Sequence, residues 1–492
     1  LYFIGNLSSK IVSAAILPIY AFFVLPNDLG AFDNAQVWAN IFATVCFMAI
    51  WEAILKFFIA EENKEKLEKR ISTVLFFIVC AITATIVISL IIGYFYNIQY
   101  LGVTVCMLIS IGMAQMWQYF ARALHENTTY VKASITGTLT NFSMLLILVC
   151  VLRLGLIGLS ISYIMGQVII VILIEYKVKI IKRFNYKRID LGELKSMLIY
   201  SVPLVLNITS LWLLNGFGRV IIVNKLGAEA NGLYTFALKF GSLVSIIGSV
   251  IGMAMCEEAI LKINDPDISE FFSDVNTRLF RLFLSICILM APAITVFYYI
   301  IGGTEYFSSL KLAMLFLLNA VFLVMSTNIG TVFNATNKTK LTFTTTVSGT
   351  AVMVIVSYLL IGRMGIAGVA IGQILGSFTM MICRWRYAKK LVNMKIKLNS
   401  ILVLFIIYII DFVISVNIGV ILNFVLFALC CLATFIVNKK DVIEKAVELM
   451  QYNGNINNKE EYLKLVMKRE EEGSTGVGEE IAIPHGKGES IS

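Results

Sequence analysis

Apolar residues gather along this chain in long runs, and short polar segments separate the runs. The sequence predicts fourteen helices from these runs, at 1–25, 36–60, 72–96, 101–122, 131–152, 155–176, 196–222, 231–257, 279–302, 309–333, 341–361, 365–384, 399–416 and 418–437. About twenty apolar residues in a helix suffice to cross a bilayer. Hydrocarbon tolerates only backbone whose hydrogen bonds are satisfied internally. We therefore expect an all-α polytopic membrane protein.

Basic residues lie mainly in alternate loops between the predicted helices. The loops after the even-numbered spans, up to the twelfth, carry 24 Lys and Arg residues. The opposite loops carry only Arg153, Lys225, Lys311 and Arg363. Cytoplasmic loops are enriched in Lys and Arg. We therefore expect both termini in the cytoplasm.

One short motif occurs twice in the chain. Residues 153–158 match residues 363–368, and Gly166 matches Gly376, at a constant separation (363 − 153 = 376 − 166 = 210). Small residues at such spacing let two helix backbones approach closely inside a bilayer. Two further matches join residues 52–56 to 258–262 (258 − 52 = 206) and residues 29–31 to 226–228 (226 − 29 = 197). The order of these matches indicates an internal duplication.

The duplication predicts two repeats, and the rest of the chain adds two further parts. We expect a six-helix bundle at 1–195 and a second at 196–397, in the same orientation and related by a pseudo-twofold axis along the membrane normal. Parallel repeats of this kind occur in transporters, with the substrate at their interface. Two extra helices at 398–440 and a short cytoplasmic tail of helix with some strand at 441–492 complete the prediction.

Composition narrows the classes of function. Hydrophobic residues make up 59% of the chain and charged residues 14%, which excludes an ordinary soluble domain. The net charge of +9 lies in loops beside the helices and indicates topology, so we expect no nucleic-acid partner. The nine cysteines form no CxxC pair, and we expect no metal. No glycine-rich phosphate loop with Lys is present, so we expect transport driven by gradients or by the membrane potential, without a cofactor.

Three cations fall inside the predicted spans: Lys10, Arg219 and Lys239. Charges in a membrane are costly and are candidates for function. The first and seventh spans open the two bundles, so these cations predict a shared cavity that binds an anion. The planar fork of Arg suits phosphate in particular. The alternative is that Lys10 and Arg219 extend to the lipid headgroups.

Three carboxylates are candidates for coupling to an ion: Glu52, Glu258 and Asp411. Glu52 and Glu258 each precede a Lys by four residues, a spacing that favours a structural pair on one helix face. Asp411 stands alone in its span. We expect it to form a buried hydrogen bond with a neighbouring helix, and cation binding is the alternative.

Residues 1–437 carry motifs of a known family, namely Tyr2-Phe3-Ile4-Gly5-Asn6, Leu17-Pro18-Ile19-Tyr20, Arg219, Leu226-Gly227-Ala228-Glu229 and Asn231-Gly232-Leu233-Tyr234. In these residues the chain resembles the polysaccharide (O-antigen type) flippases of the multidrug/oligosaccharidyl-lipid/polysaccharide exporter superfamily. It departs from them at Phe22-Phe23, where the family often has an Arg, and at Gly218, where it often has an Asp.

The resemblance implies a function for the chain. Such proteins move undecaprenyl-diphosphate-linked oligosaccharides outward across the bacterial cytoplasmic membrane by alternating access, for polysaccharide and lipopolysaccharide biosynthesis. Membrane lipids, a polysaccharide polymerase and glycosyltransferases are the implied partners. A cation-coupled drug exporter of the same fold is the alternative.

The tail carries a second resemblance. The run from Gly473 to Lys487 is similar to the start of a fructose/mannitol-type phosphotransferase enzyme IIA domain. The resemblance implies that His485 accepts a phosphoryl group and that Arg469 steadies it, although Glu480 replaces the usual Gly. A phosphotransferase sugar component phosphorylated at His485 is therefore a third candidate function. We expect the tail to be inert, because so short a segment rarely forms a core.

Overall fold

The structure is a computed structural model of the chain. It describes residues 16–492 except 60, 62, 264, 267, 337, 339, 397, 453–459, 465, 467–475, 478–480 and 483–492, and it leaves out some side chains within helices, among them that of Glu258. Three predicted site residues, Lys10, Arg469 and His485, lie outside the described residues.

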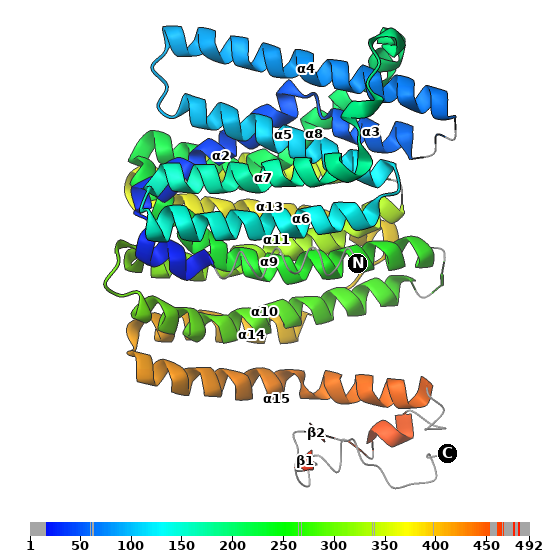
Figure 1. Cartoon of the computed structure of the whole chain (residues 1–492). Coiled ribbons are helices and arrows are strands. Elements are labelled where there is room, and N and C mark those ends of the chain that lie inside the picture. Colours follow the sequence, from blue (N-terminus) through cyan, green and yellow to red (C-terminus); the bar gives the residue numbers. More distant parts are fainter. Residues whose placement is uncertain are drawn as a thin grey trace. The chain divides into compact units, whose positions relative to one another are not determined.

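Helices make up nearly all of the described chain (Figure 1). Residues 16–23 are helical. The elements that follow are α2 (Pro26–Cys46), α3 (Ile50–Phe58), α4 (Lys64–Phe95), α5 (Leu101–Ala123), α6 (Asn127–Leu145), η1 (Leu146–Val151), α7 (Gly155–Val178), η2 (Ile181–Arg183), η3 (Tyr186–Arg188), α8 (Leu191–Leu226), α9 (Ala228–Lys262), α10 (Ile268–Ile300), η4 (Glu305–Ser309), α11 (Leu310–Ala335), α12 (Lys340–Met364), α13 (Ile366–Val392), α14 (Leu398–Asn417) and α15 (Val420–Tyr452). A two-stranded antiparallel ribbon, β1 (Gly476–Val477) and β2 (Ile481–Ala482), lies in the tail.

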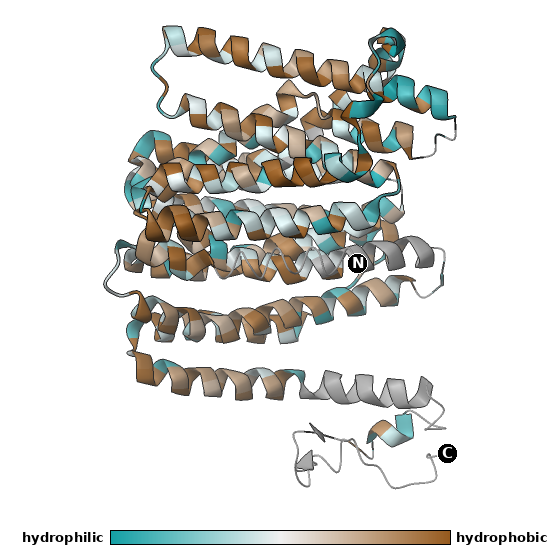
Figure 2. Ribbon diagram, viewed as in Figure 1, coloured by the Kyte–Doolittle hydropathy of each residue, from teal (hydrophilic) through white to brown (hydrophobic). Residues whose placement is uncertain are grey.

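The described residues confirm an all-α polytopic membrane protein. They contain 12 helices long and apolar enough to cross a membrane, or 13 when α2 and α3 count as one bent span. Much of the first predicted span lies outside the described residues. Most helices are apolar along their length, while hydrophilic residues gather at the start of α4 (Figure 2). This distribution is expected of helices whose middles lie in hydrocarbon.

The chain divides into two compact units. The first unit comprises Leu1–Asn276 and Phe297–Lys395, and the second comprises Thr277–Val296 and Ile396–Ser492. The first unit therefore contains most of both predicted bundles, and the second contains α14 and α15 with the middle of α10. In the second unit α15 runs without a break from Val420 to Tyr452, whereas the sequence predicts a span ending at 437 and a separate helix after it.

The duplicated glycines make the same contact in each half. A Cβ atom added to Gly166 of α7 would lie 2.8 Å from the carbonyl oxygen of Gly137 in α6. A Cβ atom added to Gly376 of α13 would lie 2.7 Å from the carbonyl oxygen of Gly349 in α12. Only glycine permits so close an approach of two backbones. The predicted role of these small residues is confirmed, and the two halves share their packing.

A third close contact joins the two halves to each other. A Cβ atom on Gly30 of α2 would lie 1.7 Å from the carbonyl oxygen of Ala228, and one on Gly232 of α9 would lie 1.8 Å from that of Pro26. The contact is reciprocal, with one separation for both pairs (232 − 30 = 228 − 26 = 202). The sequence match of residues 29–31 to 226–228 is therefore wrong by five residues, because Gly30 corresponds to Gly232 and not to Gly227.

Helix α2 begins ten residues earlier than the sequence predicts. Pro26 occupies its first turn, where the missing N–H costs nothing. The helix ends at Cys46, and Met48 and Ala49 have positive φ angles of 48° each. Helix α3 then continues at an angle of 52° to α2. The segment 26–35, which the sequence assigns to a loop, is thus a helix that packs against α9 of the second half.

A polar cluster joins the start of α4 to the start of α8. Arg70, which is 7% exposed, donates to Glu61 and Glu193 at 2.8 Å each. Lys69 lies 2.5 Å from Asp190. Lys69, together with the backbone N–H groups of Glu193 and Gly192, holds the pKa of Asp190 below its ordinary value. These bonds fix the segment through which the first half passes into the second.

Candidate functional site

An ion pair between the two halves forms the centre of the site. Arg219 Nη1 of α8 donates to Asp33 Oδ1 of α2 at 3.0 Å. The Asp33 side chain is 7% exposed and that of Arg219 is 21% exposed. Two buried charges are tolerated when they satisfy each other. Arg219 comes from the second half and Asp33 from the first, so the pair holds the halves together.

Asn231 of α9 extends this pair. Its Nδ2 donates to the carbonyl oxygen of Gly30 at 2.9 Å and to Asp33 Oδ2 at 3.3 Å, and the residue is fully buried. The close approach at Gly30 and Gly232 brings α9 near enough for both bonds. Both carboxylate oxygens of Asp33 therefore accept hydrogen bonds from the second half of the chain.

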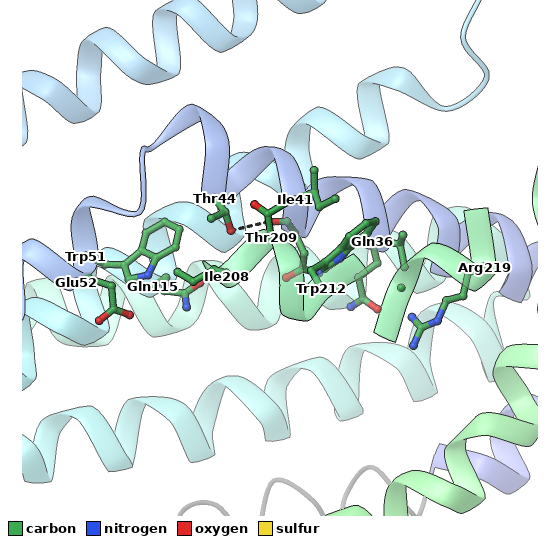
Figure 3. Close-up of a pocket in the computed structure, with 13 residues that line it drawn as sticks. Gln36, Ile41, Thr44, Trp51, Glu52, Gln115, Ile208, Thr209, Trp212 and Arg219 are labelled. Carbon is green, nitrogen blue, oxygen red and sulfur yellow. Dashed lines mark hydrogen bonds between the residues drawn. The ribbon is translucent and has the colours of Figure 1, made fainter. Parts of the chain in front are cut away.

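A polar cavity extends from the ion pair. It has a volume of about 410 Å³ and lies among α2, α3, α5 and α8. Arg219 lies at one end, and Trp51 and Glu52 lie at the other (Figure 3). Neutral polar side chains line the wall between these ends, namely Gln36, Asn40 and Thr44 of α2, Gln115 of α5 and Thr209 of α8. The cavity can hold an anionic group at Arg219 and a polar body beside it.

A match over the N-terminal half of the chain identifies its family. The family model described as polysaccharide biosynthesis protein matches residues 1–256, just over half of the 492 residues. This chain belongs to that family. A relative from Methanocaldococcus jannaschii, an uncharacterized membrane protein, is 21% identical over 401 residues, which cover 77% of this chain and 94% of the relative.

Solved structures share the fold of this family member. It is similar to the inward closed conformation of the lipid II flippase MurJ, with a TM-score of 0.70 and 15% identity over 89% of this chain and 99% of that one. It is also similar to an inward-facing multidrug resistance MATE transporter of the MOP superfamily, with a TM-score of 0.61 and 14% identity over 78% and 98% of the two chains. This member of the family is therefore a multi-pass membrane protein with the fold of these two structures.

The tail matches a second family. The model of the phosphoenolpyruvate-dependent sugar phosphotransferase system, EIIA 2, covers residues 432–492. The fructose-specific EIIABC component of Bacillus subtilis is 40% identical over 53 residues, which make up 11% of this chain and 8% of that protein. The resemblance of the tail to enzyme IIA is confirmed, and the chain spans a small fraction of that relative.

Lys239, another predicted cation, lies beside an aromatic ring. The ammonium of Lys239 in α9 lies 5.0 Å from the ring centre of Tyr20, a buried residue of the first half. A cation over an aromatic face is attracted by the ring. Lys239 therefore makes another contact between the halves, and its binding of substrate stays a prediction, as does that of Lys10.

Glu52 and Lys56 do not form the predicted pair. Glu52 Oε1 accepts a hydrogen bond of 2.8 Å from the hydroxyl of Tyr119 in α5, and the ammonium of Lys56 lies 3.9 Å from the ring centre of Tyr200 in α8. Helix α3 is short and lies between α5 and α8, so each side chain finds a partner on a neighbouring helix. Glu258 lies in α9, and its side chain is among those left out.

Asp411 forms the hydrogen bond that the sequence predicts. It is 3% exposed in α14, and Cys430 Sγ of α15 donates to its Oδ1 at 3.3 Å. Its Oδ2 has no hydrogen-bond partner among the described residues. Among all the described residues, no group of three or more His, Cys, Asp and Glu side chains could hold a metal ion.

Sequence reasoning missed Asp33 and Asn231. Asp33 lies in a polar stretch, Pro26 to Asn34, which reads as a loop between two apolar runs. Pro26 could have revealed the helix, because proline is common in the first turn. Asn231 belongs to one of the family motifs, and nothing in its local sequence shows that its partner is on α2.

Proposed function

We propose that this protein exports a lipid-linked oligosaccharide by alternating access and that Arg219 binds the diphosphate of the carrier. The observation that supports this is the double position of Arg219, which lines a polar cavity and also joins the two halves through Asp33. Arg219 Nε is buried and has no hydrogen-bond partner among the described residues. The guanidinium therefore keeps donor capacity for a second anion.

Substrate binding weakens the contact between the halves in this proposal. A diphosphate at Arg219 competes with Asp33 for the same donors, because both are anions that prefer bidentate contact. When Asp33 loses Arg219, the bond between α2 and α8 is replaced by a bond between α8 and the substrate. The start of α2 can then separate from α8 and α9, and the cavity opens toward the opposite side.

The membrane potential favours one direction of transport for an anionic substrate. With both termini in the cytoplasm of a bacterium, as the basic loops indicate, an inside-negative potential drives an anion outward. Each charge that crosses 100 mV gains about 2.3 kcal/mol. A diphosphate carrier can therefore move outward without a coupled cation. Asp411 and Glu52 remain the candidates for coupling if an ion is required.

The test measures transport by purified protein in lipid vesicles. A fluorescent diphosphate-linked oligosaccharide is placed in one leaflet, and its appearance in the other is followed with a membrane-impermeant quencher. Arg219→Gln should lower the rate about 10- to 100-fold, because a hydrogen bond to a charged group contributes roughly 1.5–3 kcal/mol. Arg219→Lys should be intermediate, because it keeps the charge and loses the planar fork.

Arg363→Gln is the matched control, since Arg363 is an exposed arginine at the end of α12. It should transport at the wild-type rate. Transport by Arg219→Gln at the wild-type rate contradicts the proposal. Transport of a cationic dye that depends on Glu52 and not on Arg219 would instead favour a drug exporter.

A further inference from the structure

A second cavity lies beside the first and differs from it in chemistry. It has a volume of about 470 Å³ and lies among the start of α2, the turn between α4 and α5, the end of α8 and the start of α9. Its polar groups are amides and hydroxyls from Asn27, Asn34, Gln99, Tyr100 and Thr104. No charged side chain among the described residues lines it. An anion would gain little there.

Aromatic rings form part of the second cavity and separate it from the first. Trp38 lines the second cavity and Trp212 lines the first, and their ring centres are 6.4 Å apart. Trp38 also stacks on Phe42 at 5.5 Å, and Phe42 lines the second cavity. Flat apolar rings beside amides and hydroxyls suit a sugar, which presents C–H groups on its faces and hydroxyls at its edge.

One helical turn links the two cavities. Arg219 lines the first and Val223 lines the second, both on α8. Four residues of helix rise about 6 Å. The first sugar of a lipid-linked oligosaccharide is joined directly to the diphosphate, so it must lie at about this distance from the phosphate-binding group. The lining of the second cavity therefore begins one helical turn from the proposed phosphate-binding residue.

Tyr100 places an aromatic ring at the second cavity from an unusual backbone conformation. Its backbone lies in the left-handed region, with φ 61° and ψ 20°, at the residue before α5. A bulky side chain rarely adopts this conformation, and Gly or Asn would fit it with less strain. The residue is 37% exposed, so burial does not account for the aromatic ring at this position.

We propose that the second cavity binds uncharged sugar units of the exported oligosaccharide next to the diphosphate at Arg219. The proposal rests on the proposed function and adds a specificity: neutral sugars are accepted beside the diphosphate, and Tyr100 and Trp38 provide the surface on which they lie. Asn34 contributes a side-chain oxygen that is buried and has no hydrogen-bond partner among the described residues, and a sugar hydroxyl can donate to it.

The test separates sugar binding from diphosphate binding. Saturation-transfer NMR on the detergent-solubilised full chain measures binding of chitobiose and lactose as neutral sugars and of sialyllactose as an acidic one, and calorimetry measures binding of pyrophosphate. The neutral sugars should bind and the acidic one should bind more weakly. Tyr100→Asn keeps a residue that suits this backbone conformation. It should weaken the binding of neutral sugars about tenfold and leave the binding of pyrophosphate unchanged.

His125→Asn is the matched control, because His125 is exposed and has the same φ of 61° at the other end of α5, away from both cavities. It should leave both ligands unchanged. The inference is overturned if no neutral sugar binds, if Tyr100→Asn binds them as the wild type does, or if a prenyl alcohol displaces them. Arg219→Gln should lose the binding of pyrophosphate and keep the binding of the sugars. If Arg219→Gln still binds pyrophosphate, the proposed function fails, and this result is distinct from a failure of sugar binding.

Discussion

Replacing Asp33 by Asn should release the start of α2 from the second half of the protein. Asn has nearly the shape of Asp and no charge, so the packing at Gly30 and Gly232 is kept. The variant loses the charged contact of 3.0 Å with Arg219. In the wild type, Asp33 Oδ2 accepts a hydrogen bond from Asn231, and in the variant an amide NH2 group, which is a donor, can take the place of that oxygen. We expect the start of α2 to separate more often from α8 and α9.

The size of the effect follows from the burial of the pair. Hydrogen bonds to charged groups contribute about 1.5–3 kcal/mol. The two side chains are 7% and 21% exposed, so solvent screens the pair only in part. A loss of about 2 kcal/mol corresponds to roughly a 30-fold change in an equilibrium constant, because about 1.4 kcal/mol is tenfold. The open population should therefore rise by about this factor while it remains the minor state.

Hydrogen exchange measures this population directly. In lipid nanodiscs, amides at 26–36 and 228–238 should exchange about 30-fold faster in Asp33→Asn, because they exchange through the open state. Amides of α6 and α13 should keep their rates and serve as the internal reference. Asp28→Asn is the matched control, since Asp28 lies five residues earlier on α2 and forms no ion pair among the described residues.

A double-mutant cycle isolates the pair. If the two side chains act through each other, Asp33→Asn combined with Arg219→Gln should speed exchange little more than either change alone. The reasoning is refuted if the starts of α2 and α9 exchange in Asp33→Asn at wild-type rates. It is also refuted if Asp28→Asn produces the same acceleration.

Three further predictions concern packing, pH and the tail. Gly376→Ala should lower stability by about 1–3 kcal/mol, because its Cβ would lie 2.7 Å from a backbone oxygen of α12, whereas Gly362→Ala, with nothing within 4 Å, should be neutral in thermal unfolding. Asp190 has a lowered pKa, so its stabilising bonds are present above the unfolded value of 3.8 and are lost as the pH falls below it; the wild type should lose more thermal stability there than Asp190→Asn. Incubation of the full chain with the phosphocarrier protein, enzyme I and phosphoenolpyruvate should leave His485 unlabelled, and stoichiometric label would contradict an inert tail.

The helices and the repeat could be predicted because both are local properties of the sequence. A transmembrane helix is determined by the length of an apolar run, and a close helix contact needs small residues at fixed spacing. Gly166 and Gly376 make the contact that their spacing indicates. The correspondence at Gly30 could not be read in this way, because Leu-Gly-Ala also occurs at Gly227 and only the contact with α9 identifies Gly232 as the partner.

The charged groups were harder to place, since their environment is set by other helices. Arg384 is the last residue of the predicted span 365–384, but α13 continues to Val392 and Arg384 is 5% exposed. Its guanidinium donates to the hydroxyls of Thr345 and Thr346 at 3.2 and 3.1 Å and to the carbonyl oxygen of Ser326 at 3.0 Å. A charge can lie inside the protein when three neighbouring groups accept its hydrogen bonds.

The backbone contact between the halves is symmetric, but the chemistry at that contact is not. Gly30 and Gly232 make the same approach from opposite sides, with a separation of 202 residues. At this separation Asp33 corresponds to Thr235 (33 + 202) and Arg219 to Leu17 (219 − 202). At this separation the ion pair therefore has no charged counterpart. Duplication alone would give two equivalent ways of opening. In the proposed function, an anion bound at Arg219 would make one of them depend on the substrate, because only a group that binds the two states differently can shift their populations.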